Sequence, residues 1–315
     1  MLTNKLTPYL QKLTKTCPAI KRQFVYSKQE NLSKNKDKKS TFIDPLMEEK
    51  YTVVRGLIHK YDNRALILLT LNCAAYCRFC TRRRKVSDIK NGLLSDEDIN
   101  NIVAYIKKHS EIKEIILSGG DPLTVPVLLQ KLLLKLSKLS QIKIIRIGTR
   151  LPVADPQKIN SKLINILKVI KNKTVYILIH FEHPKEITKQ TIIAVNKLKQ
   201  VSTMLLSQSV FLKNVNDSFD TLYELFSQLI EIEVKPYYLY HCDPVKGAEH
   251  FIVDFKKEIK IVTELRKELS GLAFPTYIID APNGAGKIPV PLEFWKFDSD
   301  KYKDFNGKIL RGLTS

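Results

Sequence analysis

The feature that most constrains this chain is a close spacing of three cysteines. Cys73, Cys77 and Cys80 form a C-x-x-x-C-x-x-C pattern directly after the apolar run at residues 65–71. Three thiolates at this spacing can bind three irons of a cubane iron-sulfur cluster and leave the fourth iron open. Since an open iron can bind and reduce a cofactor or substrate, the pattern indicates a catalytic cluster more than an electron carrier.

Zinc and disulfide bonds are the other uses that cysteines can have. A structural zinc site needs four ligands, and the further candidates Cys17, His241 and Cys242 are distant in the sequence. Spacing alone therefore keeps zinc as the minor alternative. Disulfides are disfavoured, because five cysteines is an odd number, the chain is long and no secretory leader is visible.

Composition limits the classes of protein that remain. With 315 residues and 44% hydrophobic residues, the chain can bury the core of one large α/β domain, with or without a smaller extension. No apolar run is long enough to span a bilayer, so we expect a cytoplasmic protein without a membrane partner. The net charge of +20 raises nucleic acid as a partner, but the lysines are dispersed, which disfavours that reading.

Apolar strand-like runs alternate with amphipathic helix-like segments from about residue 51. The strand-like runs are 65–71, 114–117, 142–147, 174–179, 204–207 and 234–240, and the helices that follow them are 96–108, 127–139, 160–170, 189–199, 219–230 and 256–269. This alternation predicts an α/β fold with a parallel sheet, either a partial barrel or an open doubly wound sheet. We expect a helical extension and linker at 1–50, a core at 51–295 and a short tail at 296–315.

Polar residues follow the predicted strands at the same end. They are Cys73, the turn 118–121, the segment 148–150, His180, Gln208 and Asp243. In both layouts functional groups gather beyond the carboxyl ends of the strands, so these residues should meet. Each also has a structural reading: the turn 118–121 can simply end a strand, and His180 with His183 are more often hydrogen-bonding groups than ligands of a second metal.

Several segments in this order resemble the lysine 2,3-aminomutases, a family of radical S-adenosylmethionine enzymes that includes the elongation factor P-type (R)-β-lysine-forming aminomutase. The resemblance runs from about Asp44 to about Pro291. Its segments are 56–66, the cysteine run with 81–84, 117–121, 146–153, 207–210, 236–240 and the loop that carries Lys287. Without the resemblance, Lys287 would be taken for a solvated loop lysine.

The resemblance implies a partial (β/α)6 TIM-like barrel with a mostly helical N-terminal extension, and it implies three cofactors. Cys73, Cys77 and Cys80 are expected to bind a 4Fe-4S cluster. The residues expected near S-adenosylmethionine are Ser118, Gly119, Gly120, Asp121, His180 and Gln208. The residues expected to hold pyridoxal 5'-phosphate are Lys287, Arg64 and Tyr61.

Substrate contacts also follow from the resemblance. Arg82 is expected to pair with the substrate carboxylate, and Asp243 with Asp280 are expected to take the ε-ammonium of lysine. Lys287 and Tyr240 are expected to be catalytic. Two carboxylates facing one cation in a closed site would reject substrates that lack the cation.

The implied activity is the conversion of L-α-lysine to β-lysine by a radical mechanism, with a product that could serve elongation factor P. Arginine or glutamate as substrate, and a radical enzyme acting on RNA, are the alternatives. A flavodoxin- or ferredoxin-like reductant is an expected partner, and homo-oligomerisation is left open. Zinc is expected to be absent, because Ser218 stands where zinc-binding relatives have a cysteine and no cysteine-bearing tail is seen.

Overall fold

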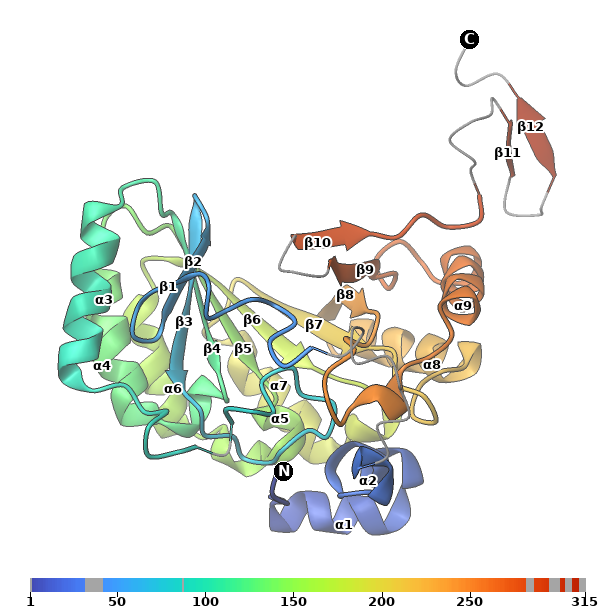
Figure 1. Cartoon of the computed structure of the whole chain (residues 1–315), viewed down its shortest axis with the longest axis horizontal. Coiled ribbons are helices and arrows are strands. Elements are labelled where there is room, and N and C mark those ends of the chain that lie inside the picture. The colour runs from blue at the N-terminus through green and yellow to red at the C-terminus, as the bar shows by residue number, and fades with distance from the viewer. Residues whose placement is uncertain are drawn as a thin grey trace.

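The computed structural model describes residues 2–31, 42–86, 88–281, 286–294, 301–303 and 308–311. Its main sheet has ten strands in sequential order (Figure 1). They are β1 (Thr52–Val54), β2 (Leu57–Tyr61), β3 (Arg64–Thr70), β4 (Glu114–Gly119), β5 (Ile144–Thr149), β6 (Thr174–His180), β7 (Met204–Val210), β8 (Val234–Tyr240), β9 (Thr276–Ala281) and β10 (Gly286–Pro289). Strands β3 to β9 are parallel, and the pairs β1–β2, β2–β3 and β9–β10 are antiparallel.

Helices cover the outer face of this sheet (Figure 1). They are α3 (Asp96–Lys108), α4 (Pro126–Ser137), α5 (Leu151–Ala154), α6 (Ser161–Leu167), α7 (Lys189–Lys199), α8 (Phe219–Glu231) and α9 (Phe255–Glu268), with short 3-10 helices η2 (Pro122–Thr124), η3 (Pro156–Lys158), η4 (Lys168–Ile170), η5 (Pro184–Glu186) and η6 (Glu249–Phe251). The predicted α/β fold with a parallel sheet is confirmed. Each of the six predicted strands overlaps one of β3 to β8.

Four strands of the sheet were not predicted. Strands β1 and β10 have three and four residues, too few for a period of two to stand out, and β10 contains both a glycine and a proline. Strand β9 follows α9 closely, and β2 is joined to β3 by a two-residue turn. Strand β2 lies in the resemblance segment 56–66, and β9 leads into the loop that carries Lys287. No predicted helix follows either strand, so the alternation of strands and helices did not identify them.

Side chains alternate across the sheet, which separates the core from the inner face. In β4, Ile115 and Leu117 are fully buried and belong to the main apolar core, whereas Glu114, Ile116 and Ser118 are only half-buried and line a cavity. Strand β5 alternates in the same way. Because successive side chains point to opposite faces of a strand, the fold packs one face on helices and leaves the other for a site.

Helix α3 begins at the predicted position. The Ser95 hydroxyl accepts a hydrogen bond from the Asp98 backbone, and the Asp98 carboxylate accepts one from the Ser95 backbone. These two reciprocal bonds satisfy two donors that a helix N-terminus leaves free. Ser218, the residue on which the expected absence of zinc was based, is the N-cap of α8, and its side chain accepts a hydrogen bond from the Thr221 backbone.

The N-terminal segment forms α1 (Pro8–Thr16), α2 (Pro18–Phe24) and the 3-10 helix η1 (Lys28–Asn31), which agrees with the predicted short helices. Leu10, Ile20 and Phe24 are fully buried and pack with Ala75 of the cysteine loop. Residues 32–41 of the predicted extension and linker, and most of the predicted tail, lie outside the described residues. The predicted domain boundaries stay predictions.

Near the C-terminus, β11 (Lys301–Lys303) and β12 (Ile309–Arg311) pair in a separate two-stranded sheet, apart from the main sheet (Figure 1). Among the described helices, none has the length and apolar character that crossing a membrane requires.

Candidate active site

One cavity of about 1120 Å³ lies against the inner face of the sheet. Its lining includes every residue that the sequence singled out for a site: Tyr61, Arg64, Cys73, Cys77, Cys80, Arg82, Ser118, Gly119, Gly120, Asp121, His180, Gln208, Tyr240, Asp243, Asp280 and Lys287. These residues span more than two hundred positions of the chain. Those that end or follow parallel strands meet because the carboxyl ends of these strands open on the same side. Tyr61, Arg64 and Lys287 reach the cavity from β2, from the start of β3 and from β10.

The three cysteines are half-buried on a loop directly after β3. Burial, together with the charge of Cys80, raises the pKa of Cys73 well above its ordinary value. Burial also raises the pKa of Cys80 to about 11. Since thiolates are the form that binds metal, this loop needs cations to become charged, and irons would supply them.

The three cysteines lie on the wall of the same cavity. Within the described ranges, no group of three or more His, Cys, Asp or Glu side chains could hold one metal ion. A cubane cluster instead takes one thiolate at each of three irons, so its ligands surround a larger body. The three cysteines on the wall of one cavity fit that arrangement.

Arg150 contacts the cysteine loop directly. Its Nη1 donates to the Cys77 sulfur at 2.8 Å, and its Nη2 donates to Gln23 and, at 3.0 Å, to Glu186. The guanidinium also lies over the ring of Phe24, 4.5 Å from the ring centre. A buried cation is therefore held beside one of the three expected iron ligands.

The turn after β4 packs against the residues that precede Cys73. A Cβ on Gly119 would lie 2.2 Å from the Thr70 carbonyl oxygen, and a Cβ on Gly120 would lie 2.2 Å from that of Asn72. The Gly120 backbone donates to the Thr70 carbonyl at 2.6 Å. Glycine is required here by this close backbone approach, whatever ligand the turn also contacts.

The carboxylate of Asp121 is occupied by the protein itself. It accepts hydrogen bonds from the Thr149 hydroxyl at 2.9 Å, the Arg150 backbone at 2.8 Å and the Leu123 backbone at 3.0 Å. Burial nevertheless raises its pKa above the ordinary value. Asp121 thus ties the end of β4 to the end of β5 while lining the cavity.

Arg82 has a buried carboxylate partner. Its Nη2 lies 2.7 Å from Glu48, and its Nε donates to the same carboxylate at 2.8 Å. Its Nη1 donates to the Ser118 hydroxyl at 3.2 Å and to the Gly119 carbonyl at 3.3 Å. Glu48 takes the Nε side of the guanidinium and thereby sets the orientation of the rest.

Lys287 lies on β10 directly opposite Asp280 of β9. Its Nζ is 2.8 Å from both oxygens of that carboxylate and 4.5 Å from the centre of the Tyr240 ring. The Tyr240 hydroxyl accepts a hydrogen bond from Gln208 at 2.8 Å. The lysine, an acid and an aromatic hydroxyl therefore meet on one wall of the cavity.

Cations gather near Lys287 on the first strands of the sheet. The Arg64 guanidinium lies 3.9 Å from the centre of the Tyr61 ring, and Lys60 also lines the cavity. Burial lowers the pKa of Lys60, the charge of Asp280 opposes this shift, and the charge of Lys287 adds to it. Two cations, Arg64 and Lys60, therefore lie on this part of the cavity wall, and Lys60 is within electrostatic range of Lys287.

Asp243 and Asp280 are close enough to interact. Burial, and then the charge of Asp280, raises the pKa of Asp243 to about 7. His241 next to it donates or accepts through Nδ1 at 2.8 Å from Glu258, a buried side chain of α9. The two aspartates form an acidic patch on the cavity wall that favours a bound cation.

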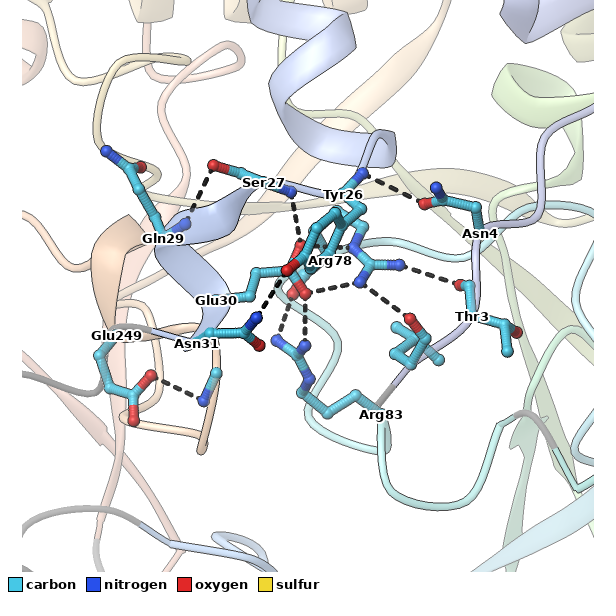
Figure 2. A network of polar contacts seen from close by, with 12 residues as sticks. Thr3, Asn4, Tyr26, Ser27, Gln29, Glu30, Asn31, Arg78, Arg83 and Glu249 are labelled. Carbon is cyan, nitrogen blue, oxygen red and sulfur yellow. Dashed lines mark hydrogen bonds and ion pairs between the residues drawn. The ribbon is translucent and has the colours of Figure 1, made fainter.

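The N-terminal extension reaches the cysteine loop through buried ion pairs (Figure 2). Glu30 lies 2.5 Å from Arg78 and 2.7 Å from Arg83, and the Arg78 guanidinium is fully buried. Arg78 also donates to the backbone carbonyls of Leu2 and Thr3. One acidic side chain of the extension thus neutralises two arginines that flank Cys80 in sequence.

Sequence reasoning missed four features of this cavity. They are Glu48, Lys60, the role of Arg150 at Cys77, and an ion pair between Glu114 and Arg146 on neighbouring strands. The alternation of β4 and β5 could have found the last pair, because both residues share the phase of the cavity-facing positions. Glu48 lies just after the start of the resemblance, and Lys60 lies in its segment 56–66. No periodic pattern of the sequence identifies either residue as facing the cavity.

Known proteins resemble this chain in sequence and in structure. Residues 67–224 match the radical SAM superfamily. The chain is 40% identical to an L-lysine 2,3-aminomutase of Methanococcus maripaludis over 84% of its own length and 62% of that protein, and 41% identical to a putative L-lysine 2,3-aminomutase of Aquifex aeolicus over 82% and 70%. A glutamate 2,3-aminomutase of Clostridioides difficile is 36% identical over 85% of this chain and 64% of that protein.

The crystal structure of a radical SAM methyltransferase from Sphaerobacter thermophilus shares the fold, with a TM-score of 0.54, 16% identity and coverage of 71% of this chain and 68% of that one. The family match implies a 4Fe-4S cluster and S-adenosylmethionine, which the cysteine loop and the cavity fit. Together with the sequence identities, these findings show that the chain belongs to the lysine 2,3-aminomutase family of the radical SAM superfamily.

Proposed function

We propose that the protein is an L-lysine 2,3-aminomutase, which moves the amino group of lysine from C2 to C3 and so forms β-lysine. The observation that carries the proposal is the lining of the cavity on the inner face of the sheet: the cysteine trio, Lys287 and the acidic pair Asp243–Asp280 all face it. The names of the relatives point the same way. The chain spans less than two thirds of the Methanococcus relative, so the activity is proposed and not transferred.

The cofactors supply the bond chemistry, and the chain supplies placement. When bound, the cluster with S-adenosylmethionine supplies reversible hydrogen abstraction from a substrate carbon, and pyridoxal phosphate carries the amino group that moves. Cys73, Cys77 and Cys80 would bind the cluster. Lys287 would hold pyridoxal phosphate, with its phosphate near Arg64, Tyr61 and Lys60.

Arg82 would bind the substrate carboxylate with the nitrogens that Glu48 leaves accessible. Glu48 already takes Nε and Nη2 of the guanidinium, and Ser118 with Gly119 accept from Nη1, so a substrate carboxylate would have to share the Nη donors with these groups. The hydrogen bonds to Ser118 and Gly119 tie this orientation to the turn after β4. Arg82 would thereby place the substrate between the cysteine loop and Lys287.

Asp243 and Asp280 would bind the ε-ammonium of lysine. Asp280 is paired with Lys287 in the structure, and it would be free for another cation once Lys287 holds the cofactor. Glutamate is disfavoured as the substrate, since its side-chain carboxylate would meet two carboxylates of the same sign. Ser118 to Asp121, His180 and Gln208 are proposed to surround S-adenosylmethionine, and Tyr240 to act beside Lys287.

The test is an anaerobic assay with reductant, S-adenosylmethionine and pyridoxal phosphate, in which the reconstituted protein should convert lysine to β-lysine. Lys287→Ala should lose the absorbance of bound pyridoxal phosphate and all turnover, while it keeps the absorbance of the cluster. The control is Lys131→Ala, because Lys131 is exposed on α4, away from the cavity, and its ion-pair partner among the described residues is exposed Asp96. Absence of β-lysine from the wild-type protein, or retention of pyridoxal phosphate by Lys287→Ala, would contradict the proposal.

Four further expectations remain predictions that accompany this function. They are a flavodoxin- or ferredoxin-like reductant, a cytoplasmic location, the supply of β-lysine to elongation factor P, and an oligomeric state that the sequence leaves open.

A further inference from the structure

Arg150 stands out among the buried cations of the chain because it contacts an iron ligand. Its Nη1 lies 2.8 Å from the Cys77 sulfur, within hydrogen-bond distance. Other residues hold the guanidinium in this position. Gln23 of α2 and Glu186 of η5 both accept from Nη2, and the rings of Phe24 and Phe79 lie 4.5 and 5.3 Å away.

The contact is built from three distant parts of the chain. Gln23 comes from the N-terminal extension, Arg150 follows β5, and Glu186 follows β6. Gln23 and Glu186 are fully buried, so neither is an incidental surface contact. The Nε of Arg150 is buried without a hydrogen-bond partner in the part of the chain that the structure describes.

We propose that Arg150 is a positioning residue that raises the reduction potential of the cluster, and that Glu186 limits this effect. The step is a one-electron reduction, in which an external reductant gives one electron to the cluster and no bond forms or breaks. Reduction adds negative charge to a buried site. A cation that donates a hydrogen bond to a ligand sulfur stabilises the reduced form, because hydrogen bonds to sulfur and local charge set the potentials of such clusters.

Arg150 and Glu186 should therefore act with opposite signs. Removing the charge of Arg150 leaves Glu186 as a buried anion near Cys77, which disfavours the added electron. Removing the charge of Glu186 leaves the positive charge of Arg150 without a neighbouring anion, which favours addition of the electron. A residue with a merely structural role would lower cluster content in both variants, with no reason for opposite shifts in potential.

The experiment is a redox titration of the reconstituted full-length protein with dithionite and mediator dyes, followed by the paramagnetic signal of the reduced cluster. No substrate is added, so the result does not depend on lysine being the substrate. Arg150→Gln should lower the equilibrium constant for reduction about tenfold, a shift of about 59 mV to more negative potential. Glu186→Gln should shift the potential to more positive values.

The control is Arg55→Gln, because Arg55 pairs with Asp98 at the exposed surface and should leave the potential unchanged. Iron content per chain is measured for every variant. An unchanged potential in Arg150→Gln with full iron content overturns the proposal. If Arg150→Gln does not retain the cluster, Glu186→Gln decides: a positive shift supports the proposal, and no shift or a negative one overturns it.

Discussion

At the scale of single residues, Asp243 shows how the cavity changes the pKa of a carboxyl group. Burial, and then the charge of Asp280, raises its pKa to about 7. Its partner Asp280 faces the Lys287 ammonium at 2.8 Å. Burial is the larger cause of the raised pKa of Asp243, the charge of Asp280 adds to it, and the charges of Lys287 and His241 oppose it.

For the proposed activity, we expect lysine turnover to decrease as the pH is lowered below about 7, because Asp243 becomes protonated. Below about pH 7 the free enzyme carries this carboxyl protonated, whereas a bound ammonium needs it ionised. Each pH unit below that pKa should therefore lower kcat/KM roughly tenfold. Asp243→Asn should have a low kcat/KM without this slope, and an unchanged slope in that variant would show that another group is titrating.

The same pKa has a consequence for stability, with the opposite dependence on pH. A carboxyl whose pKa is raised by folding binds its proton more tightly in the folded state. The contribution of Asp243 to the free energy of unfolding is thus greatest below the pKa of an unfolded aspartate and is lost as the pH rises through about 7. A cation bound beside Asp243 would stabilise its ionised form and so oppose this loss of stability.

At the scale of elements, the end of β4 controls the start of the cysteine loop. The turn after β4 donates backbone hydrogen bonds to Thr70 at 2.6 Å and to Asn72 at 2.7 Å, and Cys73 comes next. Asp121 continues the link to β5. The position of the first cysteine therefore depends on how closely two strand ends approach each other.

Gly120→Ala should disturb this approach. The added Cβ would lie 2.2 Å from the Asn72 carbonyl oxygen, so one of the two backbones must move. We expect a loss of about 1–3 kcal/mol in the free energy of unfolding and a reduced iron content after reconstitution. The matched control is Gly271→Ala, since no atom lies within 4 Å of the added Cβ there. Equal iron content in the two variants would contradict the argument.

At the scale of the whole molecule, the N-terminal extension and the cysteine loop share a buried polar network (Figure 2). Burial would raise the pKa of Glu30, but hydrogen bonds from Arg78 and Arg83 outweigh it and hold this pKa below its ordinary value. The stabilisation is therefore present above the pKa of an unfolded glutamate and is lost as the pH falls through the pKa of the folded state.

Glu30→Ala should destabilise the protein strongly, because it leaves two arginine charges without their carboxylate. Removal of one partner from a buried ion pair costs about 3–5 kcal/mol. The control Asp96→Ala breaks an exposed pair with Lys131 and should cost about 0–1 kcal/mol. Urea unfolding at neutral pH measures both. A cost for Glu30→Ala as small as that of the control would mean that the extension adds little to the stability of the whole.

Much of the fold could be predicted from the sequence because its signals are local. Apolar runs followed by amphipathic helices gave β3 to β8 and their helices, and several boundaries agree to the residue, as for α3, α7 and β8. The short edge strands β1 and β10 could not be predicted, since too few residues carry their pattern. The gathering of strand-end residues in one cavity followed from the parallel order alone.

By itself, the sequence determined where the cysteines, the strand ends and Lys287 occur, because spacing and periodicity are properties of neighbouring residues. Only the tertiary structure decided which charges meet. Glu30 and Arg78 are separated by 48 positions, Glu48 and Arg82 by 34, and Cys77 and Arg150 by 73. In a chain with 52 basic and 32 acidic residues many such pairings are possible, and only the path of the backbone selects the ones that burial makes important.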